Sequence, residues 1–359
     1  MSIEGLHRTD GVGVGKSGGR PGFGERVRRE FVDLKNSMLS DDQLSFLTRT
    51  PRWFRWPLTF AYLLRGLFFK LTPTRRAVLI LGVVLASIQV SVGQVRWDVN
   101  SLGIVLILFV LMLELKDKLL ATTELEDGHA IQRALLPRQS PRVPGWELWL
   151  FTRSANEVGG DLVDFFSLAQ DRFAVAVGDV AGKGLKAALL TAKLQATLRA
   201  LAPDAPTLAA LVGKVNAIFC RDSLPQMFSS LVYAEIASGG TAVRMINAGH
   251  IPPLVLSSAG ITQMGKGGPA LGLMPGAEFS EETVTLERND LVVFYSDGVV
   301  EARDESGEFF GEERLRTVLA GAASHSPPLI SQKLLDAVDG FRGEAKAHDD
   351  LTFLLLKRA

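Results

Sequence analysis

The chain has 359 residues, 39 basic and 39 acidic, and a formal net charge of zero. This length allows more than one domain, and the balanced charge argues against a nucleic-acid-binding protein. The single cysteine, Cys220, excludes an intramolecular disulfide and a cysteine-based zinc cluster, and it fits a small core residue in a reducing compartment. Hydrophobic residues form 47% of the chain, and the excess is concentrated in one region.

The first 76 residues divide into two segments. Residues 1–24 are rich in glycine and lack apolar periodicity, which predicts a disordered tail. Within it, Gly13-Val14-Gly15-Lys16-Ser17 has the end of a phosphate-binding loop, but Asp10 stands where that motif needs its first glycine. Residues 25–76 predict a cytoplasmic or interfacial helical segment. The reason is that 51–71 mixes aromatic and basic residues, as helices at a membrane surface do.

Two uncharged apolar stretches, residues 77–93 and 99–113, each approach the length that is needed to cross a bilayer. A polar turn from Gln94 to Asn100 joins them. Basic residues flank the outer ends of the pair, whereas the turn carries only Arg96, so the positive-inside rule places both ends in the cytoplasm. Residues 77–113 therefore predict a transmembrane hairpin that serves as an anchor, with a buried pair of soluble helices as the alternative.

Residues 114–138 predict a linker helix, because apolar residues recur at helical spacing until Pro137 stops the pattern. Three clean heptads are missing. A homodimer through this helix therefore rests on a partial coiled-coil pattern alone.

Residues 139–359 predict a separate α+β domain. Strand-like apolar runs lie at 146–153, 173–178, 228–237, 242–247, 253–257, 290–295 and 351–357. Helical patterns lie at 185–202, 207–220, 311–320 and 328–340. Strands clustered between helices, with turns of hairpin length, predict antiparallel sheets in a layered fold.

Acidic residues beside glycines or in acidic turns recur at four places next to predicted strands. Glycine lets the backbone approach an ion closely, and carboxylates are the hard oxygen ligands that Mg²⁺ and Mn²⁺ prefer. Asp-Gly pairs taken singly more often mark plain turns. Taken as a set, these acids predict a two-metal site that activates water for attack on phosphorus. The candidate ligands are Asp161, Asp179, Asp297, Asp349 and the adjacent Asp350.

Motifs across residues 130–358 occur in an order that points to one family. They are Ile131-Gln132-Arg133-Ala134-Leu135-Leu136-Pro137, Val158-Gly159-Gly160-Asp161, Gly178-Asp179-Val180-Ala181-Gly182-Lys183-Gly184, Asn247-Ala248-Gly249-His250, Tyr295-Ser296-Asp297-Gly298 and Asp349-Asp350-Leu351-Thr352. As a set they resemble the PPM (type 2C-like) family of metal-dependent protein serine/threonine phosphatases, in its bacterial SpoIIE/RsbU-like branch.

The resemblance implies a PPM-type αββα sandwich, two antiparallel sheets flanked by helices, here preceded by the two-helix transmembrane hairpin. It implies that Asp179 bridges two Mn²⁺ or Mg²⁺ ions and that the carbonyl of Val180 binds one of them. Asp161 would hold one ion directly or through water. Asp297 and Asp349 would bind the other ion, with Asp350 as the substitute for Asp349. Asp161 and Asp179 are the expected catalytic residues.

The chain departs from the wider family at one position that matters for the reaction. Ala181 stands where eukaryotic members carry a histidine proposed as general acid, so the proton donor is not identified. Arg153 is the nearest candidate for a phosphate contact. His250 and Glu301 are expected to be structural, and Lys183 is expected to be a surface charge on a loop.

The resemblance implies hydrolysis of phosphoserine or phosphothreonine on a protein by direct attack of metal-bound hydroxide. The implied substrate and partner is a phosphorylated STAS-type anti-sigma-factor antagonist, in signal transduction by partner switching. The helix entering the domain and the helix after Gly184 would act as a switch that assembles the metal site. The expected location is the bacterial inner membrane, with the catalytic domain in the cytoplasm. The alternative is a catalytically degenerate, membrane-anchored scaffold.

Overall fold

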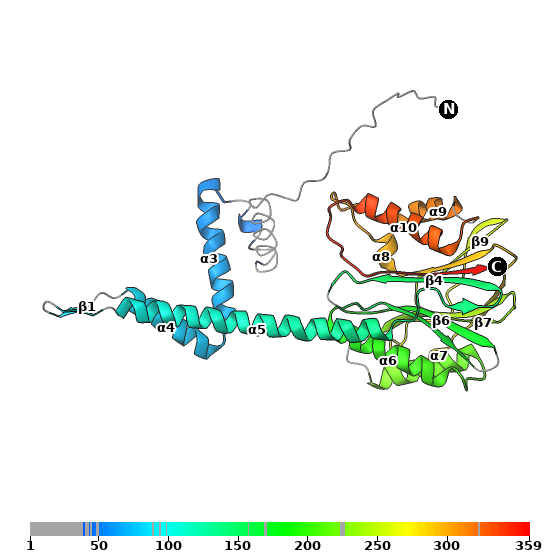
Figure 1. The fold of residues 1–359 in the computed structure, drawn as a ribbon, viewed down its shortest axis with the longest axis horizontal. Coiled ribbons are helices and arrows are strands. Elements are labelled where there is room, and N and C mark those ends of the chain that lie inside the picture. Colours follow the sequence, from blue (N-terminus) through cyan, green and yellow to red (C-terminus); the bar gives the residue numbers. More distant parts are fainter. Residues whose placement is uncertain are drawn as a thin grey trace, which may run out of the picture. The chain divides into compact units, whose positions relative to one another are not determined.

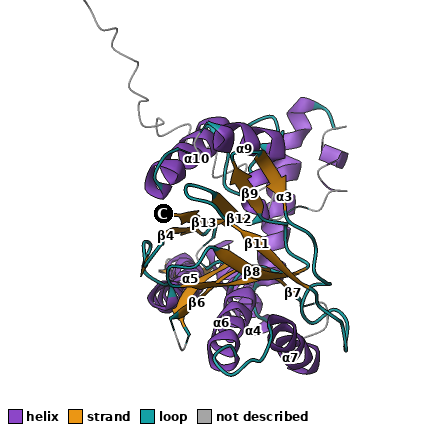
Figure 2. Ribbon diagram, turned by 90° about the vertical axis from the view of Figure 1, so that its right-hand side faces the viewer, coloured by secondary structure: helices purple, strands orange, loops and turns teal. Residues whose placement is uncertain are grey.

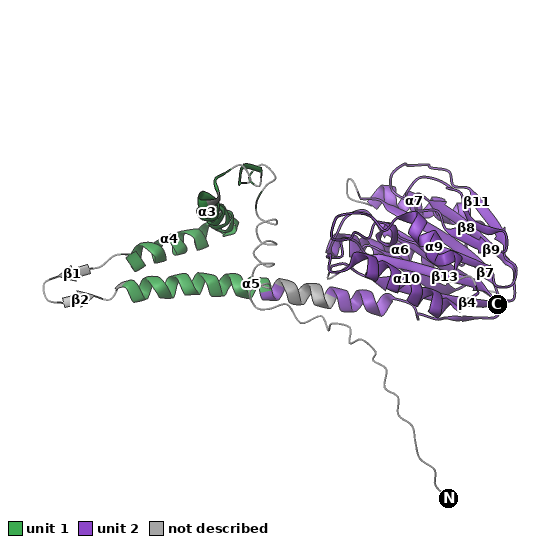
Figure 3. Cartoon of the chain, turned by 90° about the horizontal axis from the view of Figure 1, so that it is seen from above, with its two compact units in different colours: residues 1–118 green, residues 119–359 purple. Residues whose placement is uncertain are grey.

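The structure, a computed structural model, describes residues 39, 43, 45–47, 50–87, 90–92, 95–97, 99–156, 158–168, 171–222, 227–321 and 324–359. The predicted disordered tail at 1–24 lies outside these residues. The chain divides into two compact units, residues 1–118 and residues 119–359 (Figure 3).

In the residues that the structure describes, the first unit contains a helical hairpin and the helix α3 (Arg52–Lys70) that precedes it. The hairpin contains α4 (Pro73–Ser87), the antiparallel strands β1 (Val90–Val92) and β2 (Val95–Trp97), and the first part of α5 (Val99–Leu135). Gly82 and Gly103 let α4 and α5 approach closely, because a Cβ on Gly103 would collide with the backbone of Gly82 and of Ala86. Arg75 ties the same two helices together through ion pairs with Glu114 at 2.6 Å and Asp117 at 2.7 Å.

The predicted transmembrane hairpin is not supported. In the part of the chain that the structure describes, no helix combines the length and the apolar character that a membrane crossing needs. α4 ends at Ser87 and has 15 residues, about 22 Å of helix against a hydrocarbon core of about 30 Å. The second stretch, 99–113, lies in α5, which continues through the charged residues 114–118.

The second unit is built on two antiparallel sheets (Figures 1 and 2). The six-stranded sheet has the order β10-β9-β12-β13-β4-β3, and the five-stranded sheet has the order β11-β8-β7-β6-β5. The strands of the first sheet are β3 (Arg142–Val143), β4 (Trp146–Arg153), β9 (Leu254–Ser257), β10 (Gly260–Gln263), β12 (Leu291–Tyr295) and β13 (Leu351–Arg358). Those of the second are β5 (Leu162–Ser167), β6 (Arg172–Val180), β7 (Ser229–Ala237), β8 (Ala242–Ala248) and β11 (Glu281–Thr285).

Helices cover the outer faces of both sheets, so the unit is an αββα sandwich (Figure 2). α6 (Leu185–Leu201) and α7 (Leu208–Asp222) pack on the five-stranded sheet, where Leu194, Leu211 and Phe219 are fully buried. α9 (Gly311–Ala320) and α10 (Pro327–Arg342) pack on the six-stranded sheet, and the short helix α8 (Asp297–Val300) follows β12. A third apolar cluster fills the space between the sheets. The predicted α+β sandwich is confirmed.

Most predicted elements appear close to their expected bounds, because their apolar patterns match the layers they enter. β4 alternates buried and more exposed side chains, as a strand with one face on the core does. β13 is central in its sheet and is buried along nearly its whole length. β5 was not among the predicted strands. It begins directly after the glycines of the first acidic turn, and it carries the buried polar residue Asp164, which masks the strand pattern.

Candidate metal centre

Asp161 and Asp179 lie at the same end of two neighbouring strands. β5 pairs with β6 so that Leu162 is opposite Gly178, which brings Asp161, just before β5, next to Asp179 near the end of β6. Gly160 keeps this corner open. A Cβ at Gly160 would lie 3.2 Å from the carbonyl oxygen of Val180 and 3.4 Å from Oδ1 of Asp179. The two predicted catalytic aspartates and the predicted carbonyl ligand therefore share one corner of the sandwich.

Asp297 and Asp349 come to this end of the sandwich from the other sheet. β12 and β13 pair with Tyr295 opposite Phe353. Asp297 follows β12 and Asp349 precedes β13, so both lie at the same end of these two strands. Gly298 permits the close approach, because a Cβ there would collide with the carbonyl oxygen of Asp350. Residues that are far apart in the sequence thus converge through strand pairing.

The carboxylates are close enough to perturb one another. Burial raises the pKa of Asp179 to about 7, with further increases from the charges of Asp297, Asp349 and Asp350. Burial also raises the pKa of Asp297, and the charge of Asp349 adds to this effect. The pKa of Asp161 is raised well above its ordinary value, first by burial and then by the charges of Asp179 and Asp350. Mutual repulsion of this kind is relieved when cations are bound.

Asp350 differs from its neighbour Asp349 in its contacts. Asp350 is buried, and its carboxylate accepts hydrogen bonds from the backbone N–H groups of Ala155 at 2.8 Å and Gly160 at 2.7 Å. Asp349 is exposed, and its Oδ1 accepts only the backbone N–H of Asp350, at 3.0 Å, among the contacts of the described residues. The arrangement favours Asp349 as the candidate ligand and gives Asp350 the task of holding the loop before β5.

The residues fit a site for divalent cations, although they do not form a closed cluster. Within the described ranges, no three Asp, Glu, His or Cys side chains come close enough together to hold a metal ion as they stand. The Oδ2 atom of Asp161 is buried without a hydrogen-bond partner among the described residues, which is costly for a carboxylate unless a cation is present. An all-carboxylate donor set with an adjacent carbonyl is the chemistry of Mg²⁺ and Mn²⁺ sites.

Two side chains that were not among the predicted site residues hold the backbone of the glycine turn through hydrogen bonds. Gln132, near the end of α5, donates to the carbonyl of Gly159 at 2.8 Å and accepts the N–H of Gly159 at 3.1 Å. Thr191 on α6 donates to the carbonyl of Gly160 at 2.6 Å. The sequence offers one signal for Gln132. It belongs to the motif at 131–137, which contains none of the candidate catalytic residues and so has another role.

Three of the four remaining candidates have hydrogen-bond partners among the described residues. His250 is buried, and its Nδ1 shares a 2.7 Å hydrogen bond with the hydroxyl of Ser230, beside Asp179. Arg153 forms a bidentate pair with Asp339 of α10, at 2.7 and 3.0 Å. Exposed Lys183 donates to the carbonyl of His348 at 3.0 Å. Glu301 is exposed just after α8.

Comparison with known proteins points to one family. Residues 169–359 match the family model of stage II sporulation protein E (SpoIIE). The chain is 29% identical to protein IcfG of Synechocystis over 266 residues, which cover 66% of this chain and 41% of IcfG. It is 24% identical to the phosphoserine phosphatase RsbU of Bacillus subtilis over 238 residues, which cover 66% of this chain and 70% of RsbU. The chain thus spans less than half the length of IcfG.

Solved structures share the sandwich. The SiaA-PP2C domain of Pseudomonas aeruginosa aligns with a TM-score of 0.59 at 21% identity, over 67% of this chain and 98% of that domain. The PP2C phosphatase domain of SpoIIE from Bacillus subtilis aligns with a TM-score of 0.53 at 17% identity, over 61% of this chain and 63% of that chain. The fold is therefore the PP2C fold. Since the family model spans more than half of the residues, the chain belongs to the SpoIIE family of PP2C-type phosphatase domains.

Proposed function

We propose that this chain is a metal-dependent protein phosphatase that hydrolyses phosphoserine or phosphothreonine on a protein substrate. The main support for this proposal is the arrangement of the candidate metal ligands. Four carboxylates, from Asp161, Asp179, Asp297 and Asp349, gather at one end of a PP2C sandwich, where burial and the neighbouring acidic charges raise the pKa values of Asp161, Asp179 and Asp297. A binding protein that had lost its catalytic role would have no need to retain this unfavourable crowding of charge.

Different residues of the site have different roles in the proposed reaction. Asp161, Asp179, Asp297, Asp349 and the carbonyl of Val180 would hold two Mn²⁺ or Mg²⁺ ions. When bound, such ions supply an activated water and neutralise charge on the phosphate. Gly160 leaves the space beside Asp179 and Val180 free. Asp350 and Gln132 keep the loop that carries Asp161 in place. In the proposed reaction, water would attack phosphorus directly, without a phosphoenzyme.

Proton supply to the leaving group does not come from His250. Burial lowers the pKa of His250 to about 4, so the ring is neutral near pH 7 and serves to orient Ser230 beside Asp179. Ala181 offers no proton at the position that follows Asp179 by two residues. We propose that solvent water protonates the serine or threonine oxygen as it leaves.

The substrate that we propose is a phosphorylated anti-sigma-factor antagonist of the STAS type. The similarity to RsbU, a phosphoserine phosphatase, supports this choice. So does the similarity to a Mycobacterium tuberculosis protein with RsbU and RsbW domains, which aligns with a TM-score of 0.51 at 26% identity. The homodimer through the linker helix, the membrane as a partner and the location of the catalytic domain in the cytoplasm stay predictions.

The test is hydrolysis of a phosphoserine peptide by the full chain with Mn²⁺, with Mg²⁺ and with EDTA. We expect turnover that depends on the cation and falls at least a hundredfold in Asp179→Asn, because the proposed bridging carboxylate is lost. Asp336→Asn, which removes the same charge from an exposed position on α10, is the matched control and should retain full activity.

If the chain is a degenerate scaffold instead, Asp179→Asn should have no effect on hydrolysis. In that case wild type and Asp179→Asn would show the same residual hydrolysis in every cation, while binding of a phosphorylated STAS protein would persist in both. Equal activity of the two proteins would therefore reject the enzyme proposal.

A further inference from the structure

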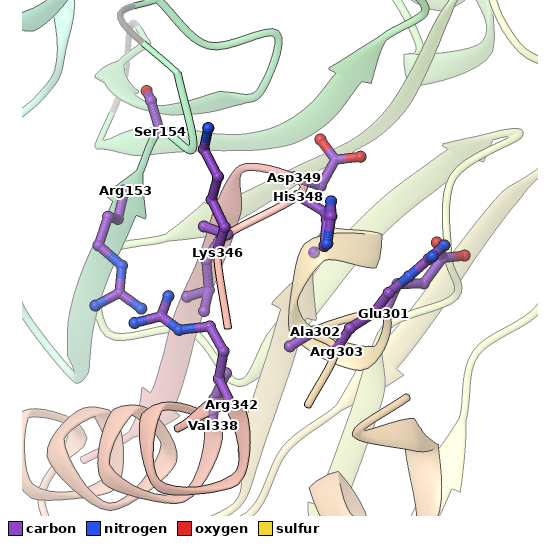
Figure 4. Close-up of a pocket in the computed structure, with 13 residues that line it drawn as sticks. Arg153, Ser154, Glu301, Ala302, Arg303, Val338, Arg342, Lys346, His348 and Asp349 are labelled. Carbon is purple, nitrogen blue, oxygen red and sulfur yellow. The ribbon is translucent and has the colours of Figure 1, made fainter. Parts of the chain in front are cut away.

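A pocket of about 140 Å³ adjoins the candidate metal centre (Figure 4). It lies between the end of β4, the residues around α8, the last turns of α10 and the loop that precedes β13. Asp349 and Gly298 belong to its lining, so it opens directly beside the carboxylates. We call it the basic pocket, because four cationic side chains line it: Arg153, Arg303, Arg342 and Lys346.

Two of these cations are held in place by a single acid. Asp339 on α10 pairs with Arg153 at 2.7 Å and with Arg342 at 3.2 Å, so one carboxylate serves two guanidinium groups, which face each other in Figure 4. The Nε atom of Arg342 is buried and has no hydrogen-bond partner among the described residues. A buried charged donor normally finds an acceptor. The pair therefore retains positive charge and an unused donor.

The other two cations stand at the exposed side of the pocket. Arg303 lies over the ring of Phe309, with its guanidinium carbon 4.8 Å from the ring centre, and Lys346 is exposed. Neither forms an ion pair with another described residue. The acids of the lining are Glu301 and Asp349, and Asp349 is a candidate metal ligand. The lining thus carries four cations and two acids, and Asp339 beside it adds a third acid, so the net charge around the pocket is positive.

We propose that the basic pocket binds the carboxylate of an acidic residue that lies close to the phosphorylated serine or threonine of the substrate. This inference rests on the proposed function. When the phosphoryl group is at the metal centre, the substrate residues next to the phosphorylated side chain lie beside Asp349. Asp349 also lines the pocket. Arginines that are already oriented by Asp339 lose little freedom on binding a carboxylate. A single exposed ion pair contributes little to binding, whereas several charges that form a network contribute measurably.

The experiment compares three phosphoserine peptides with the full chain in Mn²⁺: one with glutamates before the phosphoserine, one with glutamates after it, and one with glutamine at all of these positions. We expect one acidic peptide to exceed the neutral peptide in kcat/KM by about fivefold, and the ratio to fall with added salt. Lys346→Gln should reduce the ratio, Lys346→Glu should bring it to one or below, and Lys346→Arg should preserve it. Lys214→Gln, an equal loss of charge on the exposed face of α7, should leave the ratio unchanged.

The outcomes separate this inference from the proposed function. Lack of any cation-dependent hydrolysis of p-nitrophenyl phosphate or of the neutral peptide would overturn the phosphatase itself. Normal hydrolysis with equal kcat/KM for all three peptides, or an acidic preference that Lys346→Glu does not alter, would overturn the basic pocket alone. A preference that Lys214→Gln also removes would assign it to overall charge and would equally overturn the pocket.

Discussion

At the scale of single residues, Asp349 and Asp350 show how two adjacent acids are given different tasks. Asp350 is 6% exposed and accepts hydrogen bonds from the backbone of Ala155 and Gly160, whereas Asp349 is exposed and contributes charge to Asp179 and Asp297. Both charges therefore add to the repulsion at Asp179, but only the carboxylate of Asp350 also holds the loop before β5 through hydrogen bonds.

These contacts predict opposite effects on stability in the metal-free protein. Asp350→Ala leaves the buried N–H of Gly160 and the partly buried N–H of Ala155 without acceptors, and it should lower the free energy of unfolding by about 2–4 kcal/mol. Asp349→Ala removes a repelling charge from an exposed position and should leave that free energy unchanged or slightly higher. Urea unfolding in EDTA measures both. A loss of stability that is equal in the two variants would contradict the assignment.

The raised pKa of Asp179 predicts that the stability of the metal-free protein depends on pH. Its pKa is about 7 in the fold, mainly because of burial, against 3.8 for an ordinary aspartate. The folded state therefore holds the proton more tightly than the unfolded state between these pH values, and Asp179 should lower stability as pH rises through this window. The pKa of His250, lowered to about 4, acts in the opposite sense below its ordinary value of 6.5.

The difference between wild type and Asp179→Asn isolates the contribution of the aspartate, because His250 is common to both. Thermal unfolding in EDTA should show the variant gaining stability relative to wild type as pH rises from 4 to 7, with no further gain above about pH 8. Saturating Mn²⁺ should stabilise wild type more at pH 8 than at pH 6, since cations compete with protons. A difference that does not change with pH would refute the raised pKa.

At the scale of elements, the C-terminal part of α5 and helix α6 hold the acidic turn between them. Gln132 of α5 makes two hydrogen bonds to Gly159, Thr191 of α6 donates to the carbonyl of Gly160, and Gln195 of α6 donates to the carbonyl of Leu135 at 3.0 Å. α6 is in turn fixed to β5 by Arg199 and the buried Asp164, at 2.6 and 2.8 Å. A displacement of either helix would be transmitted to the backbone that precedes Asp161.

This linkage predicts that Gln132→Ala weakens metal binding more than it weakens the fold. Without the two side-chain hydrogen bonds the turn at Gly159 loses its support, and the Mn²⁺ concentration for half-maximal activity should rise by about tenfold. Activity at saturating Mn²⁺ should change much less. Arg133→Ala, at the neighbouring exposed position, is the control and should keep the affinity of wild type. An unchanged Mn²⁺ dependence in Gln132→Ala would exclude a coupling through this contact.

At the scale of the whole second unit, the αββα sandwich is what assembles the site. Asp161 and Asp179 lie at the ends of the neighbouring strands β5 and β6 of the five-stranded sheet, and Asp297 and Asp349 flank the ends of two strands of the six-stranded sheet. The apolar cluster between the sheets keeps them face to face, so the opposing carboxylates are held at one end of the sandwich. Repulsion among the carboxylates is thereby offset by the burial of core side chains such as Val177 and Phe294.

The sequence by itself determined the class of fold and the set of acids. Apolar alternation and acidic turns beside glycine are local properties, so the strands around Asp179 and Asp297 and the candidate ligands could be read from them. The membrane hairpin is the expectation that the structure does not support, because no helix in the described part of the chain combines the length and the apolar character that a membrane crossing needs.

Only the tertiary structure decided which of two adjacent acids faces the site and which holds the loop. That division depends on whether the backbone N–H groups of Ala155 and Gly160, almost two hundred residues earlier in the chain, lie against the carboxylate. The basic pocket likewise exists only after strand pairing brings Arg153 against α10 and the loop at 346–349. Long-range pairing of this kind leaves no local pattern, because each residue alone is an ordinary surface charge or turn.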